Sequence, residues 1–148
     1  MKGEVISINI SQETGTIKTP ITSGEFITQF GLKEDAHAGD WHRQVSLLAL
    51  ESYDKMIVNE RLPIGSFAEN ITTKGIQLYT LPVGMKLQIG ETIHEVTQIG
   101  KTCHTGCEIR SLVGDCVMPR EGIFTRVLQG GIIKKGDAIT IYEEKIDV

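Results

Sequence analysis

Residues 85–99 read MKLQIGETIHEVTQI and carry the clearest secondary-structure signal of the chain. Met85, Leu87 and Ile89 alternate with polar residues as far as a Gly-Glu pair at 90–91, and Ile93, Val96 and Ile99 follow it. A period of two residues places alternate side chains on opposite faces of a sheet, and a glycine between two such runs is typical of a turn. This stretch therefore predicts a β-hairpin.

The same alternation of apolar and polar residues recurs towards both ends of the chain. Apolar residues between Val5 and Ile10 predict a first strand, and residues 16–19 predict a short partner strand after a turn at 13–15. Ile139 and Ile141 alternate after a Lys-Gly-Asp turn and predict a closing strand. The 16 glycines separate short segments, which favours a mainly β protein, a barrel or sandwich with a few short helices.

One segment reads as a helix instead. Residues 47–60 place apolar groups near one face, and Ser46 precedes them as a plausible N-cap. We expect this helix to cover an open end of the sheet. With no repeat and no linker-like stretch, residues 1–148 are expected to form a single domain.

Charge and composition narrow the classes of function. The formal net charge is -4, and neither a basic tail nor an aromatic stripe offsets it, so nucleic acid and anionic membranes are not expected partners. The first residues alternate apolar with polar and do not resemble a signal peptide, so we expect a cytoplasmic protein. Residues 101–135 depart from the average, with six basic and three acidic residues, and this local excess favours binding of a small anion.

All three cysteines, Cys103, Cys107 and Cys116, lie in that same segment. An odd number without a secretory signal argues for reduced thiols. Basic neighbours, among them His104, would stabilise a thiolate at Cys107, which makes Cys107 the candidate reactive thiol. Two alternatives remain open: the cysteines fill space as small hydrophobic residues, or they hold a structural zinc ion, although the C-x3-C spacing fits zinc poorly.

Two further polar groups are candidates for binding. Arg120 and Arg126 follow the cysteines, and alternation places Arg126 on the same strand face as Phe124. Guanidinium groups suit a phosphate-bearing ligand because they bind its oxygens through paired donors. The alternative is that these arginines form a surface ion pair with Glu121. The second group, between residues 31 and 44, is a loop unusually dense in polar side chains. We expect at least one of its residues His37, Asp40 and Arg43 to lie near the cysteine segment; the alternative is that His37 and His42 are ordinary surface histidines.

With these residues in view, the chain resembles the MOSC domain family, whose members occur at the C-terminus of molybdenum-cofactor sulfurases and as small free-standing bacterial proteins. The resemblance runs over most of the chain in several blocks that keep the family's order. These blocks are Gly31-Leu32 with DAHAG at 35–39, RQVSLL at 43–48, GSFAENITTKGI at 65–76, LPVG at 81–84 with Ile89-Gly90, and the cysteine segment through Gly136-Asp137. One departure is Glu34, where many members have glycine.

The resemblance implies a MOSC-type β-barrel and a role with the molybdenum cofactor, or molybdopterin. A cysteine after the hairpin is thought to carry sulfur as a persulfide or to ligate molybdenum, and Cys107 matches it best, with Cys103 as the rival. The candidate cofactor-binding residues are Arg120, Arg126, His37, Asp40, Arg43, Cys103 and His104. Expected partners are a sulfur donor or a molybdoenzyme. Pyridoxal phosphate belongs to a separate domain of the sulfurases and is not expected here.

Whether the protein is an enzyme stays open at this point. The alternative from another class is a non-catalytic binding or adaptor module with structural cysteines or a zinc site. A third, weaker hypothesis is a reductase of N-hydroxylated compounds, but related enzymes of that kind carry an additional N-terminal β domain.

Overall fold

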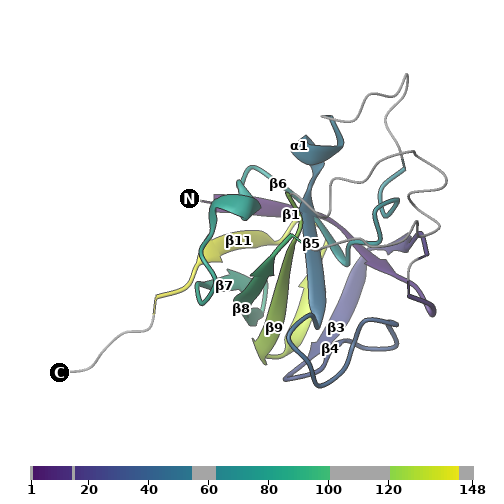
Figure 1. Cartoon of the computed structure of the whole chain (residues 1–148), viewed down its shortest axis with the longest axis horizontal. Coiled ribbons are helices and arrows are strands. Elements are labelled where there is room, and N and C mark those ends of the chain that lie inside the picture. Colours follow the sequence, from purple (N-terminus) through teal and green to yellow (C-terminus); the bar gives the residue numbers. More distant parts are fainter. Residues whose placement is uncertain (1, 15, 55–62, 101–120, 144–148) are drawn as a thin grey trace.

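The structure is a computed structural model, and it describes residues 2–14, 16–54, 63–100 and 121–143. About half of them belong to strands, and few belong to helices (Figure 1). The strands are β1 (Lys2–Ile10), β2 (Thr19–Ile21), β3 (Ser23–Ile27), β4 (Gly31–Leu32), β5 (Val45–Ala49), β6 (Ile71–Lys74), β7 (Lys86–Ile89), β8 (Thr92–Ile99), β9 (Ile123–Gln129), β10 (Gly131–Lys134) and β11 (Ala138–Ile141). Two short helices complete the list, α1 (Leu50–Tyr53) and the 3-10 helix η1 (Leu78–Thr80).

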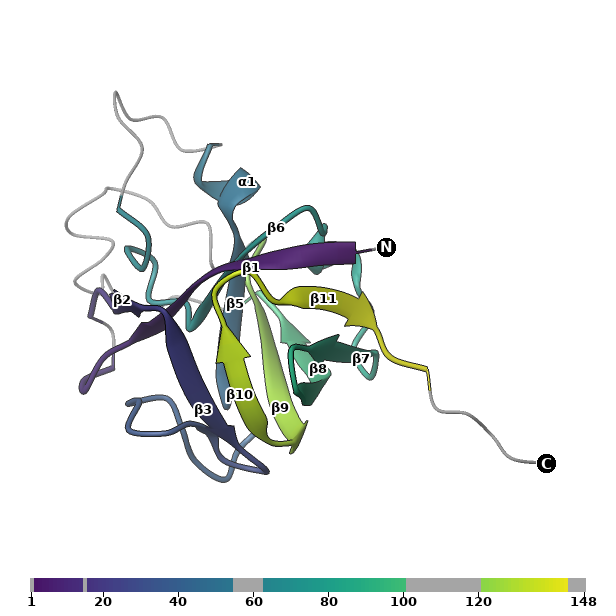
Figure 2. The same cartoon turned by 180° about the vertical axis from the view of Figure 1, so that it is seen from behind.

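Seven strands close into a barrel. The order along the sheet is β11-β7-β8-β9-β5-β6-β1-β2, and β11 also pairs with β1, which joins the two ends and leaves only β2 as an appended strand. All of these pairs are antiparallel except β5 with β6. A separate three-stranded sheet, β10-β3-β4, lies beside the barrel (Figure 2). The structure confirms the fold expected from the sequence, a mainly β barrel with a few short helices.

The predicted hairpin is confirmed as β7 and β8, in which Leu87 lies opposite His94. The first and closing strands are confirmed as β1 and β11, which pair with each other at the seam of the barrel. A single apolar cluster fills the interior; it draws on most of the barrel strands and includes Val5, Leu47, Leu87 and Val127, each of which is fully buried. In β7 alternation identified the buried side chains Leu87 and Ile89 correctly. In β8 only Val96 of the predicted apolar residues is buried, whereas Ile93 is partly exposed and Ile99 is 40% exposed, and the pairing of β8 with β9 is irregular at two points.

The predicted helix at residues 47–60 is wrong in its first part. Residues 45–49 form strand β5, which lies between β6 and β9, and only the single turn of α1 follows before residues 55–62, which lie outside the described part. Ser46 caps no helix; it hydrogen-bonds Asn70 instead. The run VSLLA is buried on both faces, and such a strand reads as a continuous apolar segment, which periodicity alone cannot distinguish from a buried helix.

The predicted partner strand at residues 16–19 begins too early. Pairing with β1 starts only at Thr19, opposite Ile10, and continues to Ile21. Lys18 precedes the strand because its backbone N–H donates to the carbonyl of Gly65 and its side chain turns into the interior. The backbone comes so close there that a Cβ on Gly65 would meet the Lys18 carbonyl oxygen at 2.2 Å, and Gly65 has a φ of +93°, so only glycine fits without displacement.

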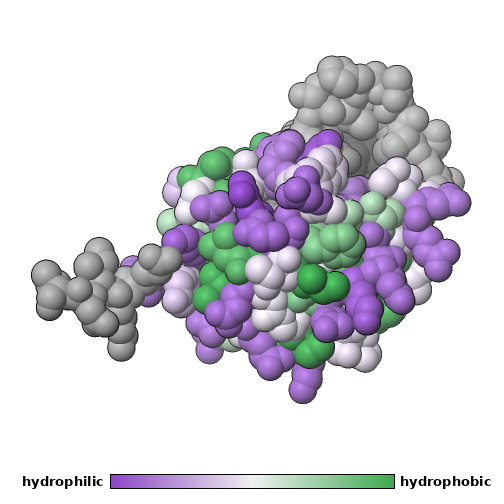
Figure 3. All heavy atoms as spheres, turned by 90° about the horizontal axis from the view of Figure 1, so that it is seen from below, coloured by the Kyte–Doolittle hydropathy of each residue, from purple (hydrophilic) through white to green (hydrophobic). Residues whose placement is uncertain are grey.

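The surface is mixed in character. The face seen from below in Figure 1 is largely hydrophilic, with hydrophobic side chains in small patches between polar ones (Figure 3). Partly exposed apolar residues include Ile27, Phe30 and Trp41, each a little more than one third exposed. Among the described helices, neither has the length or the apolar character needed to cross a membrane.

Candidate functional site

The polar loop between β4 and β5 is organised around one buried carboxylate, Asp35. Its Oδ1 accepts hydrogen bonds from Lys18 Nζ at 2.8 Å and from the backbone N–H of Ser11 at 3.0 Å, and its Oδ2 accepts from the backbone N–H of His37 at 3.0 Å. The side chains of Lys18 and Asp35 are both fully buried. Asp35 therefore connects the start of the loop to the end of β1 through Ser11 and to Lys18, and its hydrogen bond from the His37 N–H orients the backbone of His37.

Burial acts on both members of this ion pair. Loss of solvation lowers the pKa of Lys18, against which the hydrogen bond and charge of Asp35 act. Burial by itself would raise the pKa of Asp35, but the hydrogen bonds, the one from Lys18 first, hold that pKa below its ordinary value. The short contact between the two side chains and the hydrogen bonds to Asp35 favour the ionised form of the pair, whereas burial opposes it.

The preceding turn contains the departure from the family pattern. Glu34 is exposed and has a φ of +70°, in the left-handed region that glycine adopts without strain. The Asp35 N–H donates to the carbonyl of Leu32 at 3.1 Å, so the turn is closed with glutamate in it. The chain keeps a backbone conformation that suits glycine although the residue is Glu34.

The second half of the loop stacks on the outside of the barrel. The Arg43 guanidinium lies over the Trp41 ring, 4.6 Å from its centroid, and 5.5 Å from the ring centroid of Phe124 in β9. Trp41 is itself fixed, because its Nε1 donates to the carbonyl of His37 at 2.8 Å. The Arg43 guanidinium thus lies over two aromatic rings, and within the described ranges its buried Nε has no hydrogen-bond partner.

The loop also reaches β8 close to the point where the cysteine segment begins. His42 Nε2 and Gln98 Oε1 are 2.9 Å apart, and Gln98 Nε2 donates to the carbonyl of Gly100 at 2.8 Å. The Gly100 N–H in turn donates to the carbonyl of Gly122 at 2.6 Å. The two residues that flank the cysteine segment therefore lie together at the ends of β8 and β9, and His42 is linked to them through Gln98.

Arg126 lies on the same outer side of β9 as Phe124, as predicted from alternation, since Thr125 and Val127 are fully buried while Arg126 is partly exposed. Among the described residues it forms an ion pair with Glu95 of β8, with Nε 3.8 Å from Oε1, and not the predicted pair with Glu121. Arg126, Glu95 and His42 share a cavity of about 340 Å³. The structure thus brings His42, Arg43 and Arg126 to one outer surface of β8 and β9.

The remaining candidate residues divide into two groups. Asp40 is described and exposed, in the loop itself. Cys103, His104, Cys107 and Arg120 fall in residues 101–120, outside the described residues, so the prediction of one composite pocket with His37, Asp40 or Arg43 stays a prediction. Within the described ranges, which contain no cysteine, no three His, Asp or Glu side chains are grouped in a way that could hold a metal ion.

Sequence reasoning missed a buried acid, Glu69, whose charge also acts on Lys18. Glu69 is fully buried, and its Oε2 accepts hydrogen bonds from Tyr53 Oη at 2.7 Å and from Thr72 Oγ1 at 2.8 Å. Its Oε1 has no hydrogen-bond partner, and desolvation raises the pKa of Glu69 to about 7. The sequence shows only that Glu69 stands two residues before β6, within the block at 65–76 that carries the family resemblance.

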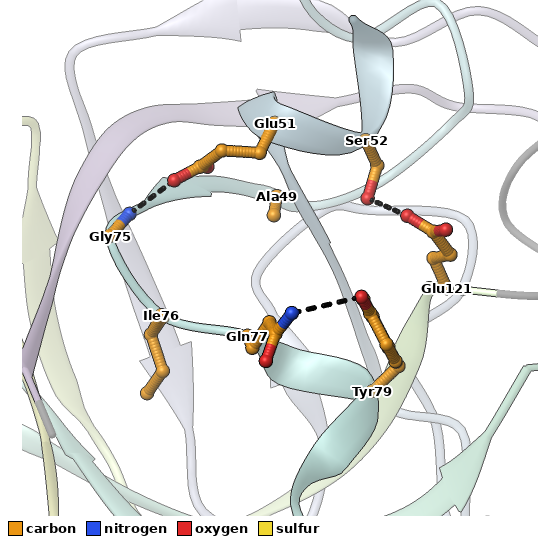
Figure 4. A pocket seen from close by; sticks show the side chains of 8 residues that line it. All are labelled: Ala49, Glu51, Ser52, Gly75, Ile76, Gln77, Tyr79 and Glu121. Atoms are coloured by element: carbon orange, nitrogen blue, oxygen red, sulfur yellow. Dashed lines mark hydrogen bonds between the residues drawn. The ribbon is translucent and has the colours of Figure 1, made fainter. Parts of the chain in front are cut away.

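A pocket of about 440 Å³ lies beside α1 (Figure 4). Its described lining consists of Ala49, Glu51, Ser52, Gly75, Ile76, Gln77, Tyr79 and Glu121. Glu121 is the first described residue after the cysteine segment, and its Oε1 accepts a 2.6 Å hydrogen bond from Ser52 Oγ. Sequence reasoning considered Glu121 only as a partner for arginine and did not single out the other lining residues.

These features define a class of protein, a small closed β-barrel. The two residues that flank its cysteine segment, Gly100 and Gly122, are hydrogen-bonded to each other at adjacent strand ends. Arginines and an aromatic ring that stacks on one of them lie on the neighbouring outer surface. A family model described as the MOSC domain matches residues 34–140. The chain therefore belongs to the MOSC domain family, which is generally linked to binding related to the molybdenum cofactor.

Solved structures share this fold. The YUAD protein from Bacillus subtilis superposes with a TM-score of 0.80 at 17% identity, with 98% of each chain covered. YiiM from Geobacillus stearothermophilus gives a TM-score of 0.71 at 18% identity, covering 95% of this chain and 75% of that one. YiiM from Escherichia coli gives 0.69 at 17% identity, covering 100% and 73%. No curated protein matches the sequence.

Proposed function

We propose that this protein binds the molybdenum cofactor, or a related molybdopterin, and accepts, carries or donates sulfur through Cys107. The observation that supports this most directly is the arrangement around Gly100 and Gly122, which are hydrogen-bonded to each other where the cysteine segment begins and ends. His42 is linked to Gly100 through Gln98, and Arg43 and Arg126 lie on the same outer surface.

The donors on this surface fit an anionic group. Arg43 is oriented by Trp41 and Phe124, and its Nε has no hydrogen-bond partner among the described residues. In the same part of the chain, Arg126 forms a 3.8 Å ion pair with Glu95. Guanidinium groups bind phosphate oxygens through paired donors, so these two residues, together with Arg120, would hold the phosphate end of a molybdopterin. When bound, such a cofactor supplies a soft metal centre that thiolate ligands suit.

Cys107 has a separate task in this proposal. A thiolate attacks the outer sulfur of a persulfide donor, the donor's S–S bond breaks, and the donor leaves as a thiol while Cys107 keeps the transferred sulfur as a persulfide. Lys101, His104 and Arg110 are close to Cys107 in sequence and would favour its thiolate over the ordinary thiol with a pKa near ~8.5. Because the donor and acceptor are small molecules or cytoplasmic enzymes, the proposal places the protein in the cytoplasm.

The experiment uses the full chain, purified from cells that make the cofactor. We expect bound molybdenum or a fluorescent oxidised pterin, and an adduct of about 32 Da on Cys107, the mass of one sulfur atom. Limiting iodoacetamide over a range of pH should label Cys107 before Cys103 and Cys116. The variant Cys107→Ser should lose the adduct, with Cys116→Ser as the matched control.

Other outcomes would contradict the proposal. Stoichiometric zinc without molybdenum would support the non-catalytic binding or adaptor module instead. Faster labelling of Cys103 in the protein without ligand would transfer the role of reactive thiol to that residue.

A further inference from the structure

An irregularity in β8 turns two neighbouring side chains to the same side. The pairing of β8 with β9 shifts its register between Val96 and Gln98, so Thr97 is the extra residue of a β-bulge. In a regular strand, neighbouring side chains point to opposite faces. Here Thr97 Oγ1 donates to the carbonyl of His42, and Gln98 Oε1 lies 2.9 Å from His42 Nε2. The bulge therefore brings Gln98 to the outer surface of the barrel, against His42.

Gln98 also determines which ring nitrogen of His42 carries a hydrogen. The Gln98 Nε2 donates to the carbonyl of Gly100 at 2.8 Å, so the amide oxygen is the atom that faces His42. The reverse orientation of the amide would place two oxygens against each other at Gly100. Because an amide oxygen only accepts, His42 Nε2 carries a hydrogen and donates it. Nδ1 is then the nitrogen left for a ligand, and it forms no hydrogen bond with another described residue.

The surroundings of His42 are rich in charge. His42 is exposed and lines a cavity of about 340 Å³ together with Arg126 and Glu95. Arg126 Nε is 3.8 Å from the Glu95 carboxylate and has no hydrogen-bond partner within the described residues. The titratable groups on the elements around His42 are Glu95 of β8, Arg126 of β9, Lys86 of β7 opposite Glu95, and His37, Asp40 and Arg43 of its own loop. A proton on His42 adds a third cation to Arg43 and Arg126, and a bound dianion favours that proton through its charge.

We propose that His42 is a further anion-binding residue of this surface and that Gln98 is the residue that positions it. When a phosphate monoester dianion binds, His42 takes up one proton from solvent at Nδ1 and donates that hydrogen to a phosphate oxygen, while its Nε2–H stays bonded to Gln98 Oε1. An imidazole can change its charge near neutral pH, and hydrogen bonds between charged groups are the stronger ones. The inference rests on the phosphate binding of the proposed function, but not on Cys107 or on sulfur transfer.

Phenyl phosphate is a suitable probe, because it carries a phosphate monoester without a pterin or a metal. With a second pKa near ~6, such a group is a dianion at about pH 8. Nitrogen-15 NMR of the full chain should show hydrogen only on Nε2 of His42 without the probe, and on both ring nitrogens at saturation. Calorimetric titration in two buffers of different ionisation enthalpy should show proton uptake on binding. His42→Gln should abolish the uptake and weaken binding about threefold, the scale of an exposed ion pair.

Gln98→Met removes both hydrogen bonds of the amide at nearly constant side-chain length. It should weaken binding of phenyl phosphate about twofold in the otherwise unchanged chain and have no effect in the His42→Gln variant, because two residues that act through one contact are not additive. Gln88→Met is the matched control, since Gln88 is an exposed glutamine of the neighbouring strand β7. It should leave both the affinity and the proton uptake unchanged.

Three results would overturn the inference: hydrogen on Nδ1 instead of Nε2 in ligand-free His42, no binding of phenyl phosphate, or binding without proton uptake. A loss in Gln98→Met that persists in the His42→Gln variant would remove Gln98 as the positioning residue. The proposed function can fail separately. If phenyl phosphate binds with proton uptake but the protein from cofactor-producing cells carries neither pterin nor molybdenum, only the proposed function fails. If it carries the pterin while His42 takes up no proton, only the present inference fails.

Discussion

Tyr53 of α1 donates its phenolic hydrogen to Glu69 across 2.7 Å in the interior of the protein. The same hydroxyl accepts from the backbone N–H of Gly65 at 2.9 Å, so one side chain joins the end of α1 to the segment that leads into β6. Burial first, and then the charge of Glu69, raises the pKa of Tyr53, so the phenol stays protonated as the donor. Because α1 borders the pocket of Figure 4, this hydrogen bond also fixes one wall of it.

The buried carboxyl of Glu69 makes stability depend on pH. Its pKa rises from 4.5 to about 7 on folding, so the folded state binds more protons than the unfolded state between these values. The stabilising effect is complete below pH 4.5 and is lost as the pH rises through about 7. Glu69→Gln should therefore be more stable than the wild type at pH 8, by up to about 3 kcal/mol, and equal to it near pH 4.

Urea denaturation of both proteins over this pH range measures the difference. Glu4→Gln, which changes an exposed carboxylate, should follow the wild-type curve. A Glu69→Gln variant whose advantage is the same at every pH would show that Glu69 is not protonated on folding near neutrality.

His94 makes the stability of the protein depend on pH in the opposite direction. It is fully buried, its Nδ1 lies 2.8 Å from Thr125 Oγ1 and its Nε2 2.9 Å from Thr92 Oγ1, and desolvation lowers its pKa to about 3. Since the unfolded value is 6.5, the stability due to neutral His94 is present above that pH and is lost as the pH falls towards 3.

Proton NMR tests this directly. The His94 ring resonances should not titrate between pH 8 and 5, while the same histidine in the urea-unfolded chain should titrate with a midpoint near ~6.5. Thr92 Oγ1 already donates to the carbonyl of Ile89, so it must accept at His94, and the proton should be found on Nε2. A midpoint above pH 5 in the folded protein would contradict the assignment.

The Lys18–Asp35 pair is expected to be sensitive to loss of one partner. Both side chains are 0% exposed, so Lys18→Met would leave Asp35 buried without its counter-ion and should cost about 3–5 kcal/mol of unfolding free energy. Lys33→Met, which breaks the exposed pair with Glu25, should cost less than about 1 kcal/mol. Chemical denaturation compares the two variants, and equal losses would mean that the buried pair has no special role.

Glu34 offers a stabilising substitution. At φ +70° a non-glycine residue is strained, so Glu34→Gly should raise stability by about 0.5–1 kcal/mol after the higher chain entropy of glycine is subtracted. Lys33→Gly is the neighbouring control and should lower it, because Lys33 is not among the residues with positive φ. Thermal unfolding at fixed pH measures both, and a less stable Glu34→Gly variant would refute the strain argument.

Binding of a molybdopterin should depend on the arginines of the outer surface. Arg126→Ala and Arg120→Ala should each weaken binding by about 1.5–3 kcal/mol, the range for hydrogen bonds to charged groups, and have little effect on folding. Lys134→Ala, an exposed change in β10, serves as the control. Unchanged affinity in both arginine variants would exclude them from the site.

Much of the fold could be predicted because short-range alternation encodes it. The hairpin of β7 and β8 and the seam strands β1 and β11 could be recognised because apolar residues alternate in parts of each, although β1 and β8 are irregular in register. The same reasoning failed at β5, where VSLLA is buried on both faces and carries no period. It also failed at residues 16–19, because Lys18 is buried in contact with Asp35, 17 residues away, and the strand begins only at Thr19.

The sequence by itself determined the class of fold, the concentration of cysteines and basic residues at 101–135, and the family resemblance. Only the tertiary structure decided which distant groups meet: Arg43 with Phe124, His42 with Gln98, Tyr53 with Glu69, and Glu51 with Glu121 around one pocket. The physical reason is that alternation fixes which way a side chain points within its own strand, whereas strand order and register fix its neighbours. Burial, which sets the pKa of Glu69 and His94, depends on those neighbours and so has no local signature.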